Sequence, residues 1–209
     1  MNPQHATDSQ ADAKQRIVLA SNNTHKVREF SELLADFPVQ VVPQGLFTDV
    51  PEADEIGLTF VENALIKARN AALHTGLAAL ADDSGIEVDA LRGAPGIYSA
   101  RYAGVGAGDE ANNRKLLQAL HGLPEQERGA RYQCLLVYMR HAEDPTPLIC
   151  QGSWEGRILT APQGENGFGY DPIFYVPEHD CSAAQLPAEV KNAMSHRGKA
   201  LQQLLRAFT

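Results

Sequence analysis

The arrangement of short apolar runs is the feature that most limits the folds open to this chain. The run Ile17–Ala20 ends in the polar turn Ser21–Asn23, after which apolar residues recur at helical spacing. A run of this length is typical of a buried strand, so the segment predicts a strand, a turn and a helix. Further apolar runs at 39–42 and 77–81 repeat the signal, which predicts an α/β fold.

Capping signals mark the ends of the predicted helices. Thr59 and Glu62 have the spacing of a capping box, in which each side chain pairs with a backbone N–H group that the helix start leaves free. Apolar residues at helical spacing continue from there to Gly76. Asp109 is expected to cap another helix, which runs through Leu120.

The second half of the chain is predicted to hold a hairpin and two more helices. Strands are expected at Tyr132–Met139 and Pro147–Ile158, because a turn-prone segment separates two long apolar stretches. Pro187 suits the first turn of a short helix that ends near Met194. Ser195 is expected to cap the last helix.

Charge and cysteine content narrow the possible functions. The 209 residues carry a formal net charge of −8, which argues against non-specific attraction to nucleic acid or to an anionic membrane. The three cysteines form no CxxC pair, so no disulfide framework or cysteine zinc site is expected, and a reducing cytoplasm fits. No stretch approaches a membrane span or a signal peptide. Residues 1–15 are expected to be a disordered polar tail, and residues 16–209 a single domain.

The turn Ser21–Lys26 is a candidate phosphate site. It lies between a predicted strand and a helix N-terminus, where free backbone N–H groups and the helix dipole favour an anion, and Lys26 adds a positive charge. The Walker pattern GxxxxGK[ST] is absent. An ordinary polar turn with a solvated lysine is the alternative interpretation.

Two adjacent carboxylates, Asp82 and Asp83, follow the apolar run 77–81 and are expected at the end of that strand, where ligands of α/β sheets gather. Adjacent carboxylates repel one another unless a cation lies between them. Mg²⁺ is the natural candidate, because it binds carboxylate and water oxygens and works with substrate phosphates. A simple turn of Asp-Asp-Ser-Gly is the alternative. The acidic loop Asp49–Glu55 offers a further ligand or is merely solvated.

The segment Gly164–Asp171 combines three glycines with two aromatic residues. Glycines let the backbone approach a ligand closely, and the aromatic rings can stack on a base or belong to the core. Lys191, His196 and Arg197 gather near the start of the last helix, which is again favourable for an anion. The glycine-rich stretch Gly104–Gly108 follows no strand and is expected to be a flexible loop.

In this order the motifs closely resemble those of the inosine triphosphate pyrophosphatase family. The matching segments are Ser21–Lys26, Gly57–Ala64 with Lys67-Ala68, Leu80–Val88, Gly93–Tyr102, Gly167–Pro172 and Ser195–Gly198. The resemblance implies hydrolysis of ITP, dITP and XTP to the monophosphate and pyrophosphate, with Mg²⁺ as cofactor. It also implies an elongated mixed β-sheet flanked by helices, two lobes around a central nucleotide-binding cleft, and a homodimer.

The resemblance also implies roles for individual residues. Asp83 is the expected proton acceptor and a Mg²⁺ ligand, and either Asp54 or Glu55 is the second metal-binding carboxylate. Lys26, Lys67 and Arg197 are expected to neutralise charge on the phosphates. The residues implied to bind substrate are Ser21, Asn22, Asn23, Thr24, His25, Lys26, Ser84, Phe168, Gly169, Tyr170, Asp171, Lys191, His196 and Arg197.

Two other functions remain open on the sequence. One is a related nucleotide pyrophosphatase of the septum-associated type, which acts on other modified or pyrimidine nucleotides, although the His196-Arg197 segment favours a purine. The other is a nucleotide-sensing module without turnover. Asp82 and Asp83 argue against a sensor, because carboxylates near a triphosphate weaken its binding unless a metal lies between them.

Overall fold

Seven strands form one mixed sheet in the order β2-β1-β3-β4-β5-β6-β7. The structure is a computed structural model that describes residues 14–35 and 37–208. β1 pairs in parallel with β2 and β3, and the remaining pairs are antiparallel, including the predicted hairpin of β4 and β5. The predicted α/β class is therefore confirmed. The strands are β1 (Gln15–Leu19), β2 (Val39–Pro43), β3 (Ala78–Val88), β4 (Gly129–Met139), β5 (Leu148–Ile158), β6 (Phe174–Val176) and β7 (Cys181–Ser182).

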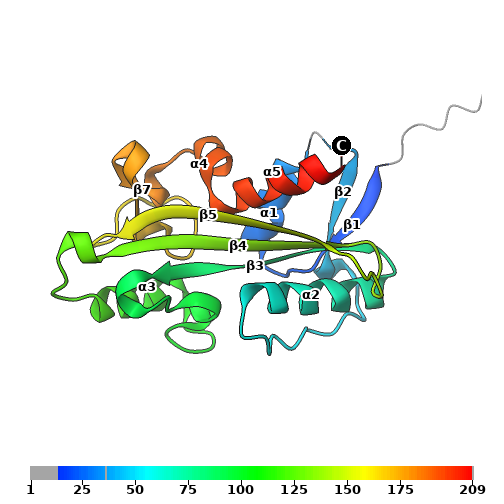
Figure 1. Cartoon of the computed structure of the whole chain (residues 1–209), viewed down its shortest axis with the longest axis horizontal. Helices are drawn as coiled ribbons and strands as arrows, with labels where there is room; N and C mark the ends of the chain where they lie inside the picture. The colour runs from blue at the N-terminus through cyan, green and yellow to red at the C-terminus, as the bar shows by residue number, and fades with distance from the viewer. Residues whose placement is uncertain (1–13, 36, 209) are drawn as a thin grey trace, which may run out of the picture.

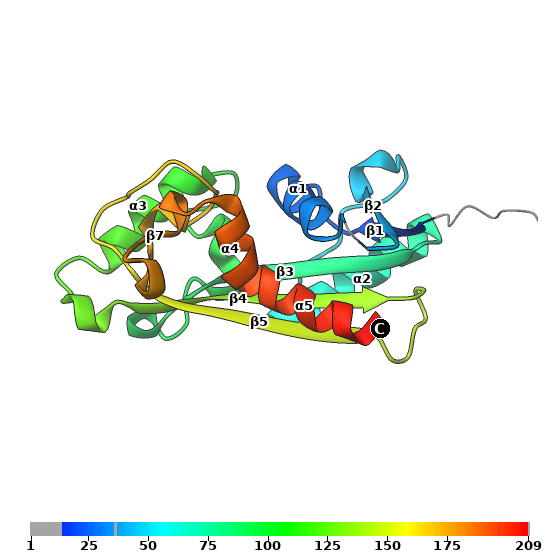
Figure 2. The ribbon, with the colours of Figure 1, turned by 90° about the horizontal axis from the view of Figure 1, so that it is seen from above.

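Helices cover both faces of the sheet. α2 packs on β3 and β4, and α5 packs on β4 and β5 from the opposite side, as Figure 1 shows. The long strands β3, β4 and β5 run along the elongated molecule. β1 and β2 lie toward one end, α3 and β7 lie toward the other, and α1 and α4 lie between them (Figure 2). The α-helices are α1 (Thr24–Leu33), α2 (Phe60–Thr75), α3 (Gly108–Ala119), α4 (Ala188–Met194) and α5 (His196–Phe208).

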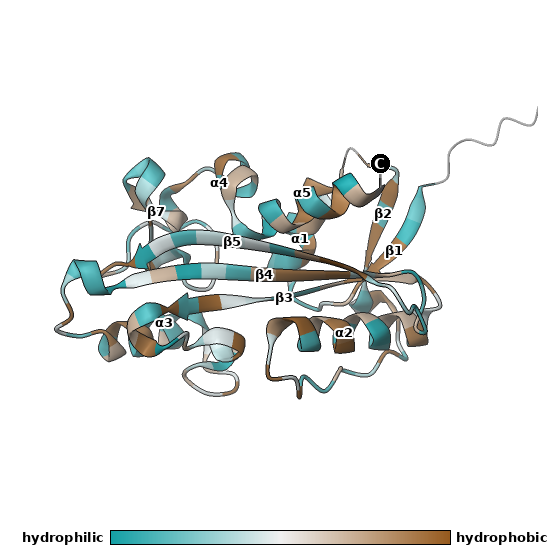
Figure 3. Ribbon diagram, in the orientation of Figure 1, coloured by the Kyte–Doolittle hydropathy of each residue, from teal (hydrophilic) through white to brown (hydrophobic). Residues whose placement is uncertain are grey.

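Side chains of β3 alternate between two parts of the core. Ala79 and Ala81 pack with the alanines of α2, whereas Leu80 packs with Phe30 of α1 and with Leu201 of α5. In Figure 3 the half of β4 between α2 and α5 is hydrophobic, and its other half carries hydrophilic segments. Because the alternation continues along a strand, residue 82 faces α1 and α5, and residue 83 faces α2.

β3 continues past the point where the sequence predicted its end. Asp82 and Asp83 were expected after the strand, but they lie in its middle and pair with Leu136 and Leu135 of β4. β4 supplies backbone partners along the whole of this segment, so the ladder continues although the side chains change from apolar to charged. The expectation that both carboxylates share one cation fails for the same reason, because they point to opposite faces.

The capping predictions are confirmed at two helices and wrong at a third. The Thr59–Glu62 capping box forms, and the Ser195 hydroxyl accepts a hydrogen bond from the Gly198 N–H at the start of α5. Asp109 does not cap α3; it lies in the first turn and accepts a hydrogen bond from Gly169. This partner is distant in the sequence, so local spacing gave no sign of it.

The described chain begins at Lys14, so most of the predicted tail lies outside the described residues. The predicted boundary at Gln15 is wrong, because Gln15 is the first residue of β1 and pairs with Val39. The segment 104–108 is a loop up to the start of α3, as predicted. Within the described residues, no helix has the length and apolar character needed to cross a bilayer.

Candidate active site

A cavity of about 360 Å³ lies beside the middle of β3. β1 ends at Leu19, opposite Leu80, whereas β3 runs on to Val88. β3 therefore extends beyond its parallel neighbour, and Asp82 and Ser84 line the cavity along this extension. The other walls come from the β1–α1 turn, the acidic loop, the glycine-rich loop and the start of α5.

The β1–α1 turn is organised by Asn23, the N-cap of α1. Its side-chain Oδ1 accepts hydrogen bonds from the backbone N–H groups of His25 (3.0 Å) and Lys26 (3.2 Å). The Ser21 hydroxyl in turn accepts one from the Asn23 N–H. These contacts fix the turn and leave the Lys26 side chain directed to the cavity, with its Nζ 3.2 Å from Asp82 Oδ2.

Asp82 is a buried carboxylate between two cations. Its side chain is 0% exposed, and Arg197 Nε donates to Asp82 Oδ2 at 2.9 Å. Burial alone would raise the pKa of Asp82, but Arg197, Lys26 and Lys67 hold that pKa well below its usual range. Asp82 is therefore ionised and poorly suited to accept a proton, and it holds Lys26 and Arg197 in place.

Arg197 joins α5 to two other elements. Its Nη1 donates to Glu29 Oε2 of α1 at 2.7 Å, and its Nη2 donates to the Ser84 hydroxyl of β3 at 3.1 Å. Burial works to lower the pKa of Arg197, but Asp82 and Glu29 raise it. The guanidinium is thus fully charged and rigidly held at the cavity wall.

Asp83 lies on the opposite face of the sheet, against α2. Lys67 Nζ is 2.5 Å from Asp83 Oδ1, and it also donates to the backbone carbonyl of Asp82 at 3.0 Å. Burial raises the pKa of Asp83, and Lys67 opposes this rise only in part. Burial acts to lower the pKa of Lys67, but the charges of Asp83 and Glu55 outweigh burial, and the pKa of Lys67 is raised. Asp83, the candidate proton acceptor, and Lys67, a candidate phosphate-binding cation, are therefore in direct contact.

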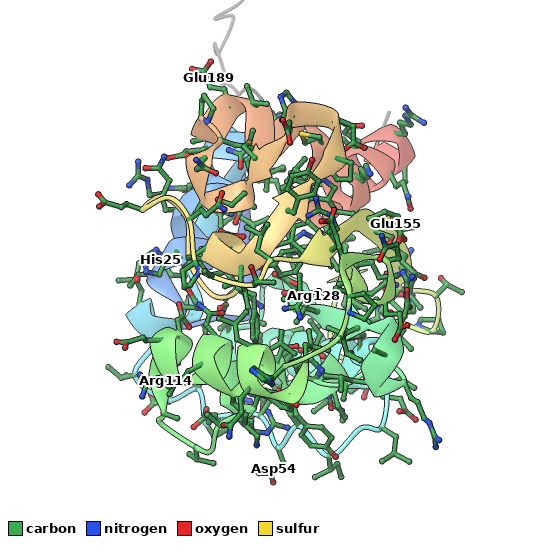
Figure 4. The ribbon with its side chains drawn as sticks, turned by 90° about the vertical axis from the view of Figure 1, so that its left-hand side faces the viewer. His25, Asp54, Arg114, Arg128, Glu155 and Glu189 are labelled. Atoms are coloured by element: carbon green, nitrogen blue, oxygen red, sulfur yellow. The ribbon has the colours of Figure 1, made fainter. Side chains whose placement is uncertain are left out.

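The acidic loop brings Glu55, and not Asp54, to this pair. Glu55 Oε1 lies 3.2 Å from Lys67 Nζ, and Glu55 Oε2 lies 3.8 Å from Arg101. Figure 4 shows Asp54 at the outer edge of the molecule, pointing away from it. Of Asp54 and Glu55, the geometry favours Glu55 as the candidate for the second metal-binding carboxylate.

The carboxylates of Asp83 and Glu55 both contact the ammonium group of Lys67, so they lie close to each other. Among the described residues, no group of three His, Cys, Asp or Glu side chains could hold a metal ion by itself. Mg²⁺ is commonly held by one or two carboxylates together with substrate phosphates and water. The donor set therefore fits Mg²⁺ that arrives with a polyphosphate, and it does not fit a metal held by protein ligands alone.

The glycine-rich loop is folded around the buried carboxylate of Asp171. This carboxylate accepts hydrogen bonds from the Phe168 N–H (2.9 Å), the Tyr132 hydroxyl (3.2 Å) and Lys191 Nζ (2.5 Å). Gly167 has a φ of 76°, and a Cβ atom there would overlap the Asp171 carboxylate. Only glycine fits at this position, which brings Phe168 to the cavity wall.

α3 holds the same loop from the other side. Asp109 Oδ2 accepts a hydrogen bond from the Gly169 N–H at 2.6 Å, and Asn113 Nδ2 donates to the Gly169 carbonyl at 3.0 Å. The Tyr170 hydroxyl donates to the carbonyl of Ser99 at 2.7 Å. Both polar groups of the Gly169 residue are thus paired with α3.

His196 is a buried histidine at the cavity wall. Its ring stacks on Tyr132 with centroids 4.6 Å apart and an interplanar angle of 7°. Its buried Nδ1 atom has no hydrogen-bond partner among the described residues. Burial, reinforced by the charge of Arg197, lowers the pKa of His196 well below its usual value, so the ring is neutral. A neutral imidazole with a free nitrogen can exchange a hydrogen bond with a ligand.

Most of the residues expected at the site come together around this one cavity. Thr24, His25, Asp54 and Asp83 do not line it, although Asp83 lies directly beside Lys67, which does. The expected residues that line it are Ser21, Asn22, Asn23, Lys26, Glu55, Ser84, Phe168, Gly169, Tyr170, Asp171, Lys191, His196 and Arg197.

Sequence reasoning missed several residues that support the site. Glu29 follows Lys26 by three positions on α1, and this helical spacing indicates that it lies on the same face as that lysine, where it pairs with Arg197. Tyr132 and Asn113 had no such signal, because each acts on a segment far away in the sequence.

Comparisons with known proteins show what this chain is similar to. The model of the Ham1 family matches residues 17–207. A protein of Vibrio cholerae named dITP/XTP pyrophosphatase is 61% identical over 92% of this chain and 96% of its own. The solved structure of a HAM1 protein from Coxiella burnetii is 52% identical, with a TM-score of 0.86 over 93% of this chain and 98% of its own. A nucleoside-triphosphatase / dITP/XTP pyrophosphatase from Mycobacterium abscessus is 42% identical, with a TM-score of 0.74 over 91% of this chain and 99% of its own.

Proposed function

The chain belongs to the Ham1 family, and from this premise we propose that it hydrolyses non-canonical purine nucleoside triphosphates to the monophosphate and pyrophosphate. The substrates are ITP, dITP and XTP, whose bases carry a carbonyl group at the purine 6-position. The protein is thus a nucleoside triphosphate pyrophosphatase, which removes these nucleotides from the nucleotide pool.

The observation that carries this proposal is the distribution of chemistry along one cavity. Its lining includes the cations Lys26 and Lys67, the ring of Phe168 from the glycine-rich loop and the neutral imidazole of His196 from the start of α5. Cations suit a triphosphate, and an aromatic ring with a nearby hydrogen-bonding group suits a base. A nucleoside triphosphate would bind to the cations through its phosphates and to the aromatic and hydrogen-bonding groups through its base.

Asp83 is the proposed general base. It takes a proton from a water molecule, and the water oxygen attacks the α-phosphorus. The bond between this phosphorus and the oxygen that links it to the β phosphate breaks, and pyrophosphate leaves. Burial raises the pKa of Asp83, which makes this carboxylate a stronger base, whereas Arg197 and Lys26 hold the pKa of Asp82 well below its usual range. The two neighbouring carboxylates therefore take different roles.

The triphosphate is proposed to lie between the β1–α1 turn and the Lys67 ammonium group. The turn contributes Ser21–Lys26, Lys67 balances charge near Asp83, and Arg197 with Ser84 completes the wall. When bound with the substrate by Asp83 and Glu55, Mg²⁺ supplies charge that stabilises the leaving pyrophosphate.

Selectivity is proposed to rest on the base end of the cavity. His196 can donate a hydrogen bond to a 6-oxo group, and the positive charge of Arg197, which Asp82, Glu29 and Ser84 hold in place, also favours that acceptor. The 6-amino group of adenine would leave the His196 donor unpaired. Phe168 stacks on the base, and Lys191 and Asp171 keep Phe168 in position. We also propose that the protein works in the cytoplasm as a homodimer.

The proposal is tested with a nucleotide panel of dITP, XTP, dATP and dGTP in the presence of Mg²⁺. We expect pyrophosphate release with a kcat/KM for dITP and XTP that exceeds that for dATP by about 100-fold or more, because paired donors discriminate strongly. Equal turnover of dITP and dATP would contradict the proposed selectivity. Binding of dITP without turnover would instead support a sensor.

A further inference from the structure

The imidazole of His25 lies against the ring of Phe168. Their centroids are 5.2 Å apart, and the interplanar angle is 19°. His25 belongs to the first turn of α1, whereas Phe168 belongs to the glycine-rich loop, so the contact joins two segments that are far apart in the sequence. In Figure 4 His25 lies at the side of the molecule, where α1 approaches that loop.

Only one of the two rings faces the cavity. Phe168 lines it, together with Lys191 and Arg197, whose cationic groups lie 5.1 and 5.9 Å from the Phe168 centroid. His25 does not line the cavity, and its residue is exposed. The His25 ring therefore supports Phe168 from the side of the rim and leaves the interior of the cavity to a ligand.

The backbone around Phe168 is held from behind. Asp171 accepts a hydrogen bond from the Phe168 N–H, and Asp109 and Asn113 pair with both polar groups of Gly169. These contacts fix the backbone of the loop and do not involve the Phe168 ring. The stacked His25 ring restrains the Phe168 side chain from the rim, because stacked aromatic rings in contact resist rotation of either one.

We propose that His25 is a positioning residue for the purine base, which acts by fixing the ring plane of Phe168, and that its side chain is not a ligand of the triphosphate. The inference rests on the proposed function. His25 contributes to the phosphate turn through its backbone N–H, which Asn23 already accepts. Its side chain instead connects the triphosphate end of the site to the base end.

The test separates a base contact from a phosphate contact. The wild type, His25→Ala and His25→Phe are compared by calorimetry with the α,β-methylene analogue of dITP, which cannot be cleaved, and with inorganic tripolyphosphate, which has no base. His25→Phe keeps a stacking ring but removes the imidazole nitrogens, so it is the matched control. Because no turnover is needed, a failure of the proposed catalysis does not affect the result.

For His25→Ala we expect a Kd for the dITP analogue about 2- to 10-fold higher than that of the wild type, the range that an aromatic pair accounts for. The Kd for tripolyphosphate should stay within about 2-fold, and His25→Phe should restore the Kd for the analogue. Weaker tripolyphosphate binding that His25→Phe does not restore would overturn the inference, because His25 would then be a phosphate ligand. An unchanged Kd for the analogue in His25→Ala would overturn it as well.

Discussion

Asparagine substitutions at Asp82 and Asp83 should have different effects, although the two residues are adjacent and chemically identical. Each substitution keeps the size of the side chain and removes its charge. Asp83→Asn removes the proposed base, and general-base catalysis accounts for about 100- to 10,000-fold in rate. We therefore expect kcat for dITP to fall by this factor. Burial raises the pKa of Asp83, so its ionised form adds no net stability to the fold, and Lys67 keeps Glu55 and the carbonyl of Asp82 as partners; Asp83→Asn should therefore cost little stability.

Asp82→Asn should act mainly on stability. It leaves the buried guanidinium of Arg197 with Glu29 as its remaining carboxylate, and it removes the partner of Lys26. Breaking a buried ion pair on one side costs about 3–5 kcal/mol. In a protein of this size that corresponds to a fall in Tm of roughly 6–20 °C.

The assay is a pair of measurements on each variant, kcat with dITP at saturating Mg²⁺ and Tm by calorimetry. We expect Asp83→Asn to lose turnover with a Tm within about 4 °C of the wild type, and Asp82→Asn to lose Tm clearly. A much lower unfolding temperature for Asp83→Asn, with an unchanged one for Asp82→Asn, would contradict these roles of the two carboxylates. Near-normal turnover in a folded Asp83→Asn protein would show that another group is the base.

Five further variants test the rest of the site. His196→Ala should lower kcat/KM for dITP much more than for dATP, whereas Phe168→Ala should lower both alike; an unchanged dITP/dATP ratio in His196→Ala would move the discriminating contact elsewhere. Gly167→Ala should lower Tm by several degrees and raise KM, because φ is 76° and the added Cβ would overlap a carboxylate; a wild-type KM would contradict this. Glu55→Gln should raise the Mg²⁺ concentration needed for half-maximal activity, and Asp54→Asn should leave it unchanged; the opposite result would assign the metal ligand to Asp54.

Local sequence signals were enough for the elements that begin the site. The apolar run Ile17–Ala20 and the polar residues after it predicted β1, the turn and α1, because a buried strand and a helix cap each follow from neighbouring residues. The capping box at Thr59 fixed the start of α2, and therefore the face on which Lys67 lies. The candidate residues themselves could be chosen from residue types and from family resemblance.

Contacts between residues far apart in the chain are the features that the sequence did not predict. The continuation of β3 through Asp82 and Asp83 depends on β4, which lies about fifty positions later in the chain, so charged residues that suggest a turn became the middle of a strand. The same holds for Asp109, which the sequence placed at a helix cap and which the structure pairs with Gly169. The strand register then decided which way each carboxylate points, and this direction gave Asp82 and Asp83 their different environments.

Phosphorus NMR of a reaction mixture with dITP and Mg²⁺ shows which phosphate bond the protein cleaves. Cleavage between the α and β phosphates predicts that the triphosphate signals are replaced by those of dIMP and pyrophosphate in equal amounts, and that no signal of orthophosphate or dIDP appears. A parallel sample of Asp83→Asn should keep the triphosphate signals. Release of orthophosphate with formation of dIDP, or triphosphate signals that persist in the presence of the wild-type protein, would contradict cleavage between the α and β phosphates.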